Sequence, residues 1–443
     1  MNFKFRSMAK AASFFLGAMC LFIAAGCGSS SSKTASTAVS NTVPVMANFG
    51  PPGAGGDVDV LFVSVTVCQH GTSNCTTIDN VKVDTGSFGL RVVSAAVSGV
   101  TLTQINESNS ALEECVQYAD TSYSWGPMQL ADVQIGSEKA FNIPIQVIGA
   151  TNNLPVPQKC LTTPVATGVP NGGNEDSLGS LGANGILGIG GEVFDCGSTC
   201  ANSASNMYYI CPSGTCQEVA APTSNQAVNP IAEFTSSDNN GVVITLPAVP
   251  ATGSVSVSGT MTFGIGTQSD NALTGVTLFA MDACGNFPSA SFNGITYMDN
   301  VCQTGSGGFG AFLDTGSNGL FLLDANTLHS VDAAISDCTN TNESGFYCLT
   351  AGGTATLSPI SLLGDGNVGS GTVSVNITDA NKLFSTNNAE FNDLGGDSVV
   401  NGSATTDFFD FGLPFFLGKK VFVGIAGQAA PAGVNAPNGF VAF

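Results

Sequence analysis

The chain has 443 residues, which is enough for two packed domains. Acidic residues outnumber basic ones by 32 to 11, and the resulting anionic surface argues against nucleic acid as a partner because it repels phosphate backbones. The 55 glycines and the low charged fraction of 10% predict a mostly β protein with many turns rather than a helical bundle.

The first 27 residues have the pattern of a bacterial secretion signal. Three basic residues precede the apolar stretch AASFFLGAMCLFIAAG, and the segment ends in IAAGC with a cysteine at position 27. This ending resembles the lipobox of bacterial lipoproteins, although Ala24 stands where lipoboxes usually carry leucine. The resemblance implies a signal peptide over residues 1–26, cleavage before Cys27 and lipidation of its sulfur. The alternative is an ordinary signal peptide that is cut nearby.

Residues 27–43 are small and polar, and are expected to form a flexible tether. Gly28 rather than Asp follows the cysteine, which by analogy with lipoproteins favours the outer membrane. No later stretch is long and apolar enough to cross a bilayer, so membrane attachment rests on the lipid. We therefore expect a lipid-anchored protein of the bacterial cell envelope, facing the periplasm or displayed at the cell surface.

Twelve of the 14 cysteines remain once Cys20 leaves with the signal and Cys27 carries lipid. An even number in an oxidising compartment predicts disulfides. The sequence does not give their connectivity, but neighbouring cysteines suggest a set of pairs. These are Cys68 with Cys75, Cys115 with Cys160, Cys196 with Cys200, Cys211 with Cys216, Cys284 with Cys302, and Cys338 with Cys348. The alternative for the four cysteines between 196 and 216 is a zinc site, which their spacing disfavours.

Alternating apolar and polar residues predict strands along most of the chain. The expected strands lie in DVDVLFVSVTVCQ (57–69), in MQLADVQIGSEKAFNIPIQVIG (128–149) around a Gly-Ser turn, in GVVITLP, and in SVSVSGTMTFGIG. Helical signals are few. One helix is expected over 324–337, and a short one near Pro414, where proline suits the first turn.

The most informative feature is an internal repeat. VKVDTGSFGLRVV (81–93) and GAFLDTGSNGLFLL (310–323) share the motif D-T-G-S-x-G-L. Each copy is followed by an element that places a glycine after apolar residues, NGILGIGGEVF (184–194) and DFGLPFFLGKKVFVGI (410–425). Periods of 20 to 50 residues are absent, so the pattern indicates a duplicated lobe rather than a solenoid.

The two aspartates of the repeat, Asp84 and Asp314, would each leave a buried strand and enter a tight Thr-Gly turn. If the two loops meet, the carboxylates converge. At about 3 Å and an effective dielectric near 20 they repel by roughly 5 kcal/mol, so they would share a proton. One carboxyl then acts as a general base toward water and the other as a general acid toward a carbonyl oxygen, without a metal or a cofactor.

These paired motifs resemble the two lobes of a pepsin-like aspartic peptidase. The resemblance implies a mostly β, bilobal fold, with an N-terminal lobe over 44–247, a C-terminal lobe over 248–443, and a cleft between them. Asp84 and Asp314 would be the catalytic residues at the base of the cleft. The implied substrate is an extended peptide or protein, cut by a bound water, and the expected state is a monomer.

The same resemblance implies roles for further residues. Support of the two loops would fall on Thr85, Gly86, Ser87, Thr315, Gly316 and Ser317. QYADTSYSWGPMQLADVQIG (117–136) is similar to the flap hairpin of that family and places Tyr118 at the flap tyrosine. Two departures are Asp120, in a flap that is usually rich in glycine, and Arg91, where the family often has an aromatic residue. The whole chain also resembles a group of bacterial lipoproteins that is defined by a domain of unknown function.

Two alternatives compete with catalysis. The aspartates could be turn residues that cap strands, a role that the duplication disfavours. The stronger rival keeps the pepsin-like fold without the chemistry, as a lipoprotein that binds peptide or glycan or serves as an envelope scaffold.

Other side chains carry weaker signals. Two histidines, His70 and His329, leave little basis for a Ser-His-Asp triad. Tyr118 and Trp125 are alternatively core residues of a hairpin. Several acidic residues near the C-terminus are expected on a solvated surface, with a calcium site as the alternative. They are Asp393, Asp397, Asp407 and Asp410.

Overall fold

The computed structural model describes residues 40–118, 122–150, 154–161, 173–300, 302, 310–340, 343–350, 353–398 and 408–443. The predictions for the signal peptide, for Cys27 and for most of the tether concern residues outside these ranges, as do those for Asp120 and Asp407. Within these ranges, no helix is long and apolar enough to span a membrane.

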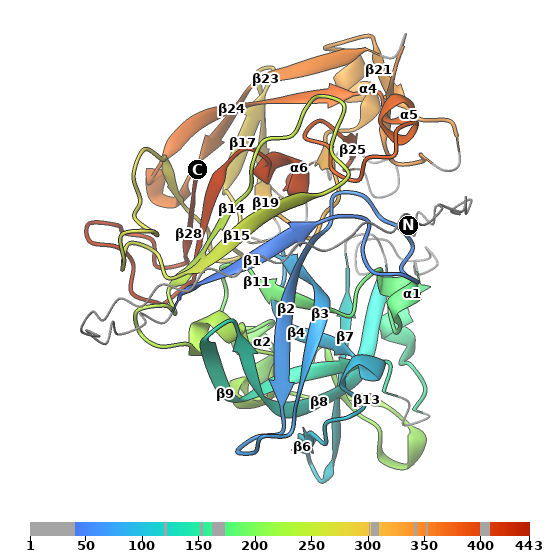
Figure 1. Cartoon of the computed structure of the whole chain (residues 1–443), viewed down its shortest axis with the longest axis vertical. Coiled ribbons are helices and arrows are strands. Elements are labelled where there is room, and N and C mark those ends of the chain that lie inside the picture. Colours follow the sequence, from blue (N-terminus) through green and yellow to red (C-terminus); the bar gives the residue numbers. More distant parts are fainter. Residues whose placement is uncertain are drawn as a thin grey trace, which may run out of the picture.

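The protein is mostly β, as predicted, and its strands form one large sheet and three smaller ones (Figure 1). The large sheet contains β1 (Thr42–Ala47), β2 (Leu61–Cys68), β3 (Cys75–Asp84), β4 (Phe88–Val93), β5 (Thr103–Gln104), β6 (Asn106–Glu107), β7 (Ser110–Gln117), β8 (Ser122–Ile135), β9 (Glu138–Ile148), β10 (Gly173–Asn174), β11 (Gly185–Ile189), β12 (Tyr208–Ile210), β13 (Gln217–Glu218), β14 (Gly241–Thr245), β15 (Val257–Phe263), β16 (Leu278–Ala280), β27 (Lys420–Gly424) and β28 (Phe440–Ala442).

The three smaller sheets lie in the C-terminal half. They are β17 (Ser289–Phe292), β18 (Ile295–Met298), β23 (Thr354–Leu363) and β24 (Ser370–Thr378); β19 (Ala311–Asp314), β20 (Leu320–Leu322), β25 (Gly395–Asp397) and β26 (Phe409–Gly412); and β21 (Ile335–Asp337) with β22 (Tyr347–Leu349). The short helices are α1 (Leu178–Leu181), α2 (Gly197–Asn202), α4 (Ala325–His329), α5 (Ala380–Phe384) and α6 (Leu413–Phe416).

The predicted strands are confirmed, and so is the turn that joins two of them. The segment over 128–149 forms β8 and β9, joined at Gly136, which has a φ of +61° in the turn. The strands β2, β14 and β15 fall within the other three predicted segments. The short helix near Pro414 is also confirmed, because α6 has its proline in the first turn.

The helix predicted over 324–337 is mostly wrong. Asp324 caps α4 by accepting hydrogen bonds from the backbone N–H groups of Asn326 and Thr327, and the helix ends at His329. The rest of the segment turns into β21, whose Ile335 pairs with Leu349 of β22. Beyond α4, the pairing of β21 with β22 thus overrides the helical pattern of the sequence.

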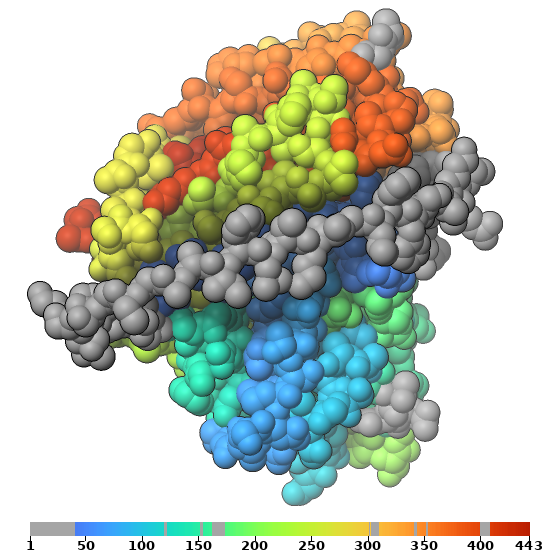
Figure 2. Space-filling model, viewed as in Figure 1, coloured from blue at the N-terminus to red at the C-terminus, as the bar shows by residue number. Residues whose placement is uncertain are grey.

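The two halves of the chain occupy different parts of the molecule. Residues coloured blue to green lie in the lower part of Figures 1 and 2, and residues coloured yellow to red lie in the upper part. The strand β1 is an exception to this division. It starts at Thr42, inside the range expected for the tether, and pairs antiparallel with β15 from Thr42–Thr262 to Ala47–Val257. The sheet then continues through β14, β27, β28 and β16.

The internal repeat folds the same way twice. In the first copy β3 pairs parallel with β11, β11 antiparallel with β4, and β4 parallel with β9. In the second copy β19, β26, β20 and β25 pair in the same order and directions. Each aspartate lies opposite the glycine of its downstream element, Asp84 opposite Gly188 and Asp314 opposite Gly412. The largest apolar cluster joins both copies and includes Val83 and Leu313.

All six predicted disulfides are present. The zinc alternative is wrong, because Cys196 is bonded to Cys200 and Cys211 to Cys216. The disulfide with the largest sequence separation joins Cys115 of β7 to Cys160, 45 residues later in the chain. This bond fixes the loop after β9 against the β7–β8 hairpin.

A buried group of carboxyls lies where the segment before β2 meets the C-terminal half. The backbone N–H of Asp59 donates to Ala389 O at 2.8 Å, and the N–H of Phe391 donates to Asp59 Oδ1 at 2.7 Å. Beside this contact both carboxylate oxygens of Glu390 and one oxygen of Asp393 are buried without a hydrogen-bond partner. Burial raises the pKa of all three carboxyls, and that of Glu390 to about 9.

This group predicts that the protein is more stable in acid than in alkali. Because the pKa of Glu390 rises from 4.5 to about 9 on folding, the folded state keeps a proton that the unfolded state loses. Its contribution to stability is therefore complete below about 4.5 and is lost as the pH rises through about 9. We expect Glu390→Gln to lose less stability than the native protein between about pH 5 and pH 9, with each pKa unit equivalent to about 1.4 kcal/mol.

Thermal unfolding followed by circular dichroism measures this difference. Glu233→Gln is the matched control, since Glu233 is an exposed carboxyl. Parallel pH dependence in the native protein and both variants would show that Glu390 is not protonated in the fold.

Candidate active site

The loops that follow β3 and β19 are held together by four reciprocal hydrogen bonds. Thr85 Oγ1 donates to Leu313 O at 2.9 Å, and Thr315 Oγ1 donates to Val83 O at 2.8 Å. Each hydroxyl also accepts from the other loop, from Thr315 N at 3.0 Å and from Thr85 N at 3.1 Å. Both threonines are buried, so every one of these polar groups is satisfied by the other copy of the repeat.

This cross-linking brings the two aspartates together. Their carboxyls lie close enough for the charge of Asp84 to raise the pKa of Asp314. The glycines of the motif are required by this close approach. A Cβ on Gly86 would lie 2.5 Å from Asp314 Cγ, and a Cβ on Gly316 would lie 2.7 Å from Asp84 Cγ. Any larger residue at either position would therefore push the carboxyls apart.

Each carboxyl is fixed by its own loop in the same way. Asp84 Oδ1 accepts from Gly86 N at 2.8 Å, and its Oδ2 accepts from the Ser87 hydroxyl at 2.5 Å. Asp314 Oδ1 accepts from Gly316 N at 2.7 Å, and its Oδ2 from the Ser317 hydroxyl at 2.7 Å. All the residues predicted to support the two loops thus contact the carboxyls or the other loop.

The surroundings of Asp314 favour its protonated form. Burial and the charge of Asp84 raise the pKa of Asp314 to about 7, against hydrogen bonds from Ser317 and Gly316 that lower it. The site is also within reach of solvent, because Gly86 is exposed and Asp314 is only partly buried. It therefore has one carboxyl ready to donate a proton and one ready to accept it.

Tyr118, the predicted flap tyrosine, lies at the end of β7, and residues 119–121 of the hairpin tip fall outside the described ranges. Its N–H donates to Ser122 O at 2.9 Å, and its hydroxyl is 3.0 Å from Ser124 Oγ. Its ring packs beside an apolar cluster of the N-terminal half that includes Phe62. Burial raises the pKa of the Tyr118 hydroxyl, so it remains a neutral donor.

Trp125 is a core residue of the same hairpin. It is 7% exposed and packs edge-on against Tyr209 with ring centroids 5.6 Å apart. The Cys115–Cys160 disulfide belongs to the same cluster. The alternative of a hairpin core is therefore confirmed for Trp125.

Arg91 is the centre of a buried ionic network instead of an aromatic contact to the hairpin. It is 1% exposed and donates to Glu114 Oε1 at 2.9 Å and to Asp195 Oδ2 at 3.0 Å. Burial lowers the pKa of Arg91, but these two carboxyls raise it above its usual value on balance, so the guanidinium stays charged. Tyr208 donates to Asp195 at 2.7 Å and completes the network.

A polar chain connects this network to Tyr118. Gln146 Nε2 donates to Glu114 O at 2.8 Å, and its Oε1 accepts from Ser124 Oγ at 3.1 Å. Ser124 in turn bonds the Tyr118 hydroxyl. Arg91 thus supports the tyrosine through three intermediate groups, all on β7, β8 and β9.

The predicted acidic surface near the C-terminus is wrong for two of its members. Asp393 is buried and accepts from Thr378 Oγ1 at 2.6 Å, while Asp410 is buried beside Asp314. The available sequence signal was the position of Asp410, two residues before Gly412 in an element that is otherwise apolar. Sequence analysis missed it because charge alone suggested exposure.

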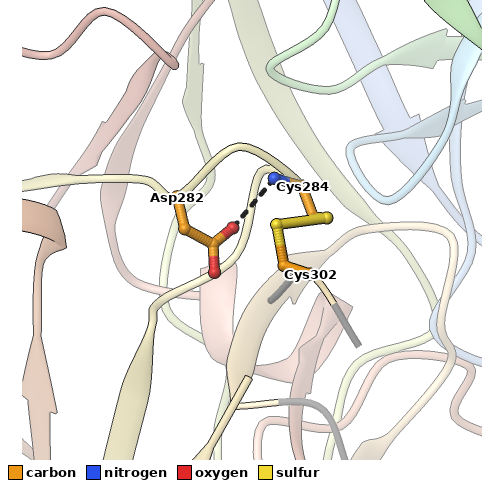
Figure 3. A group of neighbouring side chains, drawn as sticks. All are labelled: Asp282, Cys284 and Cys302. Carbon is orange, nitrogen blue, oxygen red and sulfur yellow. Dashed lines mark hydrogen bonds between the residues drawn. A yellow bond between two sulfur atoms is a disulfide. The ribbon is translucent and has the colours of Figure 1, made fainter. Parts of the chain in front are cut away.

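One further group of possible metal ligands lies among the described residues, formed by Asp282, Cys284 and Cys302. Figure 3 shows the two sulfur atoms bonded to each other next to the Asp282 carboxyl, whose Oδ1 accepts from Cys284 N at 3.0 Å. The group therefore offers no thiolate, and it stabilises a disulfide loop rather than an ion.

A family model covers nearly all of the described chain. It is that of "Protein of unknown function (DUF3443)", and it matches residues 37–443. The chain belongs to this family.

None of the curated proteins matches the chain. Among solved structures, it is similar to the crystal structure of an aspartic proteinase from Irpex lacteus. The TM-score is 0.47 and the sequence identity 16%, over 90% of this chain and 96% of that one. At this identity, the similarity says nothing about activity.

The reciprocal hydrogen bonds of the two threonines predict that the removal of one hydroxyl strongly lowers the free energy of unfolding. Thr315→Val keeps the shape of the side chain but leaves Val83 O and Thr85 N unpaired in a buried site. We expect a loss of about 2–6 kcal/mol in the free energy of unfolding, at about 1–3 kcal/mol for each of the two unsatisfied groups. Denaturant unfolding followed by fluorescence measures it.

Thr315→Ser is the matched control because it retains the hydroxyl and removes only a methyl group, worth about 1 kcal/mol. Equal losses in the two variants would mean that the hydroxyl contributes little to the junction of the loops.

Proposed function

We propose that this protein is an aspartic-type endopeptidase of the cell envelope that hydrolyses peptide bonds with a water activated by Asp84 and Asp314. The observation that carries the proposal is the pair of carboxyls that the two cross-bonded loops bring together, in which burial and the charge of Asp84 raise the pKa of Asp314 to about 7. Such a pair supplies both an acid and a base at a single point.

The asymmetry of the pair suggests the role of each carboxyl. With the shared proton on Asp314, the carboxylate of Asp84 takes a proton from a water molecule. The oxygen of this water attacks the peptide carbonyl carbon. Asp314 gives its proton to the carbonyl oxygen, and a tetrahedral diol forms. Asp84 then passes its proton to the leaving nitrogen, Asp314 recovers one from a diol hydroxyl, and the C–N bond breaks.

The proposal includes a substrate-binding cleft between two lobes, at about 44–247 and 248–443, with an extended peptide as substrate and Tyr118 close to it. One observation supports this placement. The repeated four-strand units meet at the loops that carry the two aspartates. We also propose that the enzyme works as a monomer.

The proposal predicts that the purified mature protein cleaves a denatured protein in acid. Activity should fall as the pH rises through about 7, because Asp314 then loses its proton. Asp84→Asn and Asp314→Asn should each lower kcat on the order of a thousand-fold or more while the protein stays folded. Cleavage followed by mass spectrometry, across the acidic and neutral range, measures both effects.

Asp270→Asn, at an exposed aspartate, is the matched control and should retain full activity. If the native protein cleaves nothing and also binds no statine-type inhibitor, the catalytic proposal fails. A non-catalytic protein that binds peptide or glycan, or serves as a scaffold, would then take its place.

We further propose that the protein is anchored by lipid on Cys27 to the outer membrane, facing the periplasm or the cell surface. Support comes from the lipobox-like IAAGC and from the six disulfides, which require an oxidising compartment.

Cys27→Ser should abolish labelling by radioactive palmitate and move the protein from the membrane to the soluble fraction. Cys20→Ser, inside the proposed signal peptide, is the matched control and should leave both unchanged. Membrane association that survives Cys27→Ser would rule out this anchor.

A further inference from the structure

A cavity of about 290 Å³ lies in the C-terminal half, between β24 of a four-stranded sheet and β16 of the large sheet. One wall includes Thr277 and Phe279, and the other is formed by residues 371–374 of β24. The two walls diverge from a shared point, because Ala280 N donates to Val368 O at 2.9 Å just before β24 begins. Neither aspartate of the proposed active site lines the cavity, so it is a separate site.

The β24 wall is the edge of a strand. Successive side chains of a strand point to opposite faces, so four consecutive residues line one cavity only along the edge of the strand. β24 is the last strand of its sheet, and along residues 371–374 its outer side pairs with none of the described strands. Gly371 leaves room there, since a Cβ on it would lie 3.1 Å from Phe279 Cζ. A glycine inside a strand often marks a place where a ligand approaches the backbone.

Three aromatic rings make the opposite side of the cavity apolar. Phe279 stacks on Phe443 with ring centroids 5.3 Å apart, and Phe415 meets Phe443 edge-on at 5.0 Å. Phe279 and Phe415 are buried, while Phe443 is only half-buried. Ligand pockets are typically lined by such side chains, with a few polar groups, at volumes of about 300–1,000 Å³. This cavity lies at the lower end of that range and therefore suits a small apolar body.

The charged group of the cavity is Lys419, which follows α6. Its Nζ donates to Phe415 O at 2.5 Å and lies 4.1 Å from the centre of the Phe415 ring. An ammonium has three N–H donors, so this carbonyl leaves two for a ligand. Within the described ranges, no carboxylate forms an ion pair with Lys419. Because a charge that is withdrawn from water is costly without an opposite charge, a bound anion would stabilise the ammonium.

We propose that this cavity binds a small monocarboxylate with an apolar body, either an aliphatic or an aromatic acid. The carboxylate pairs with Lys419 and accepts hydrogen bonds from backbone N–H groups on the outer edge of β24, while the apolar body packs against the three phenylalanines. A single ammonium balances one negative charge, so a monoanion matches the site better than a phosphate ester does. The site does not depend on the proposed peptidase activity.

Isothermal titration calorimetry of the purified protein measures the binding. Octanoate and phenylpropionate distinguish an aliphatic from an aromatic body, while octanol and octylamine carry no charge and a positive charge on the same aliphatic chain. We expect at least one acid to bind, and to bind about ten-fold or more tightly than octanol and octylamine. If neither acid binds, or if octanol or octylamine binds as tightly as the better acid, the proposal is wrong.

Two variants locate the binding. Lys419→Met removes the charge but keeps an unbranched apolar side chain, and should weaken binding of the acid by about ten-fold or more. Gly371→Val places a side chain in the cavity against Phe279 and should abolish binding. Lys420→Met, at the neighbouring lysine that does not line the cavity, is the matched control and should bind like the native protein.

Thermal unfolding shows which variants are folded. The two variants change the cavity in independent ways, so either one decides the proposal if the other does not fold. Native affinity for the acid in a folded Lys419→Met or Gly371→Val protein would place the binding elsewhere and overturn the proposal.

Discussion

The arrangement of the site depends on one exchange of hydrogen bonds, in which the threonine of each D-T-G-S loop bonds the backbone of the other loop. Residues 83–85 and 313–315 are 230 positions apart, yet each segment supplies hydrogen-bond partners to the buried polar groups of the other. Because an unpaired polar group in this setting costs about 1–3 kcal/mol, the two loops are stable together and not apart. The closeness of the carboxyls follows from this exchange and not from any attraction between them.

The proximity of like charges is tolerated because the surroundings supply donors and protons. Each aspartate accepts from a glycine N–H and a serine hydroxyl of its own loop. The raised pKa of Asp314 favours a proton there, which removes one of the two negative charges. Raised pKa values recur near Asp59 and Glu390, where burial is the largest cause. An acidic chain with 11 basic residues buries its carboxyls as neutral acids more readily than as ion pairs.

Much of the site could be predicted from sequence because it is duplicated. The repeat identified Asp84 and Asp314 as partners, and the spacing of apolar residues placed each at a strand end. The disulfide set was also predictable, since most pairs are close neighbours. The burial of Asp410 was not predictable, because it depends on strand pairing between segments almost 100 residues apart. The sequence marked Arg91 only as a departure from the pepsin-like pattern. Its ionic network was not predictable, because its partners Glu114 and Asp195 come from distant parts of the chain.

The pairing of β1 with β15 has a consequence for how the protein forms. Residues 42–47 leave the ribosome early, but their partner at 257–263 follows more than 200 residues later. Until then β1 has at most the short contact with β2, and its remaining backbone groups are an open sheet edge. Contacts of such long range form slowly. Folding is therefore completed only when the second half of the chain has been made, and an incomplete chain would expose an edge that is prone to aggregate.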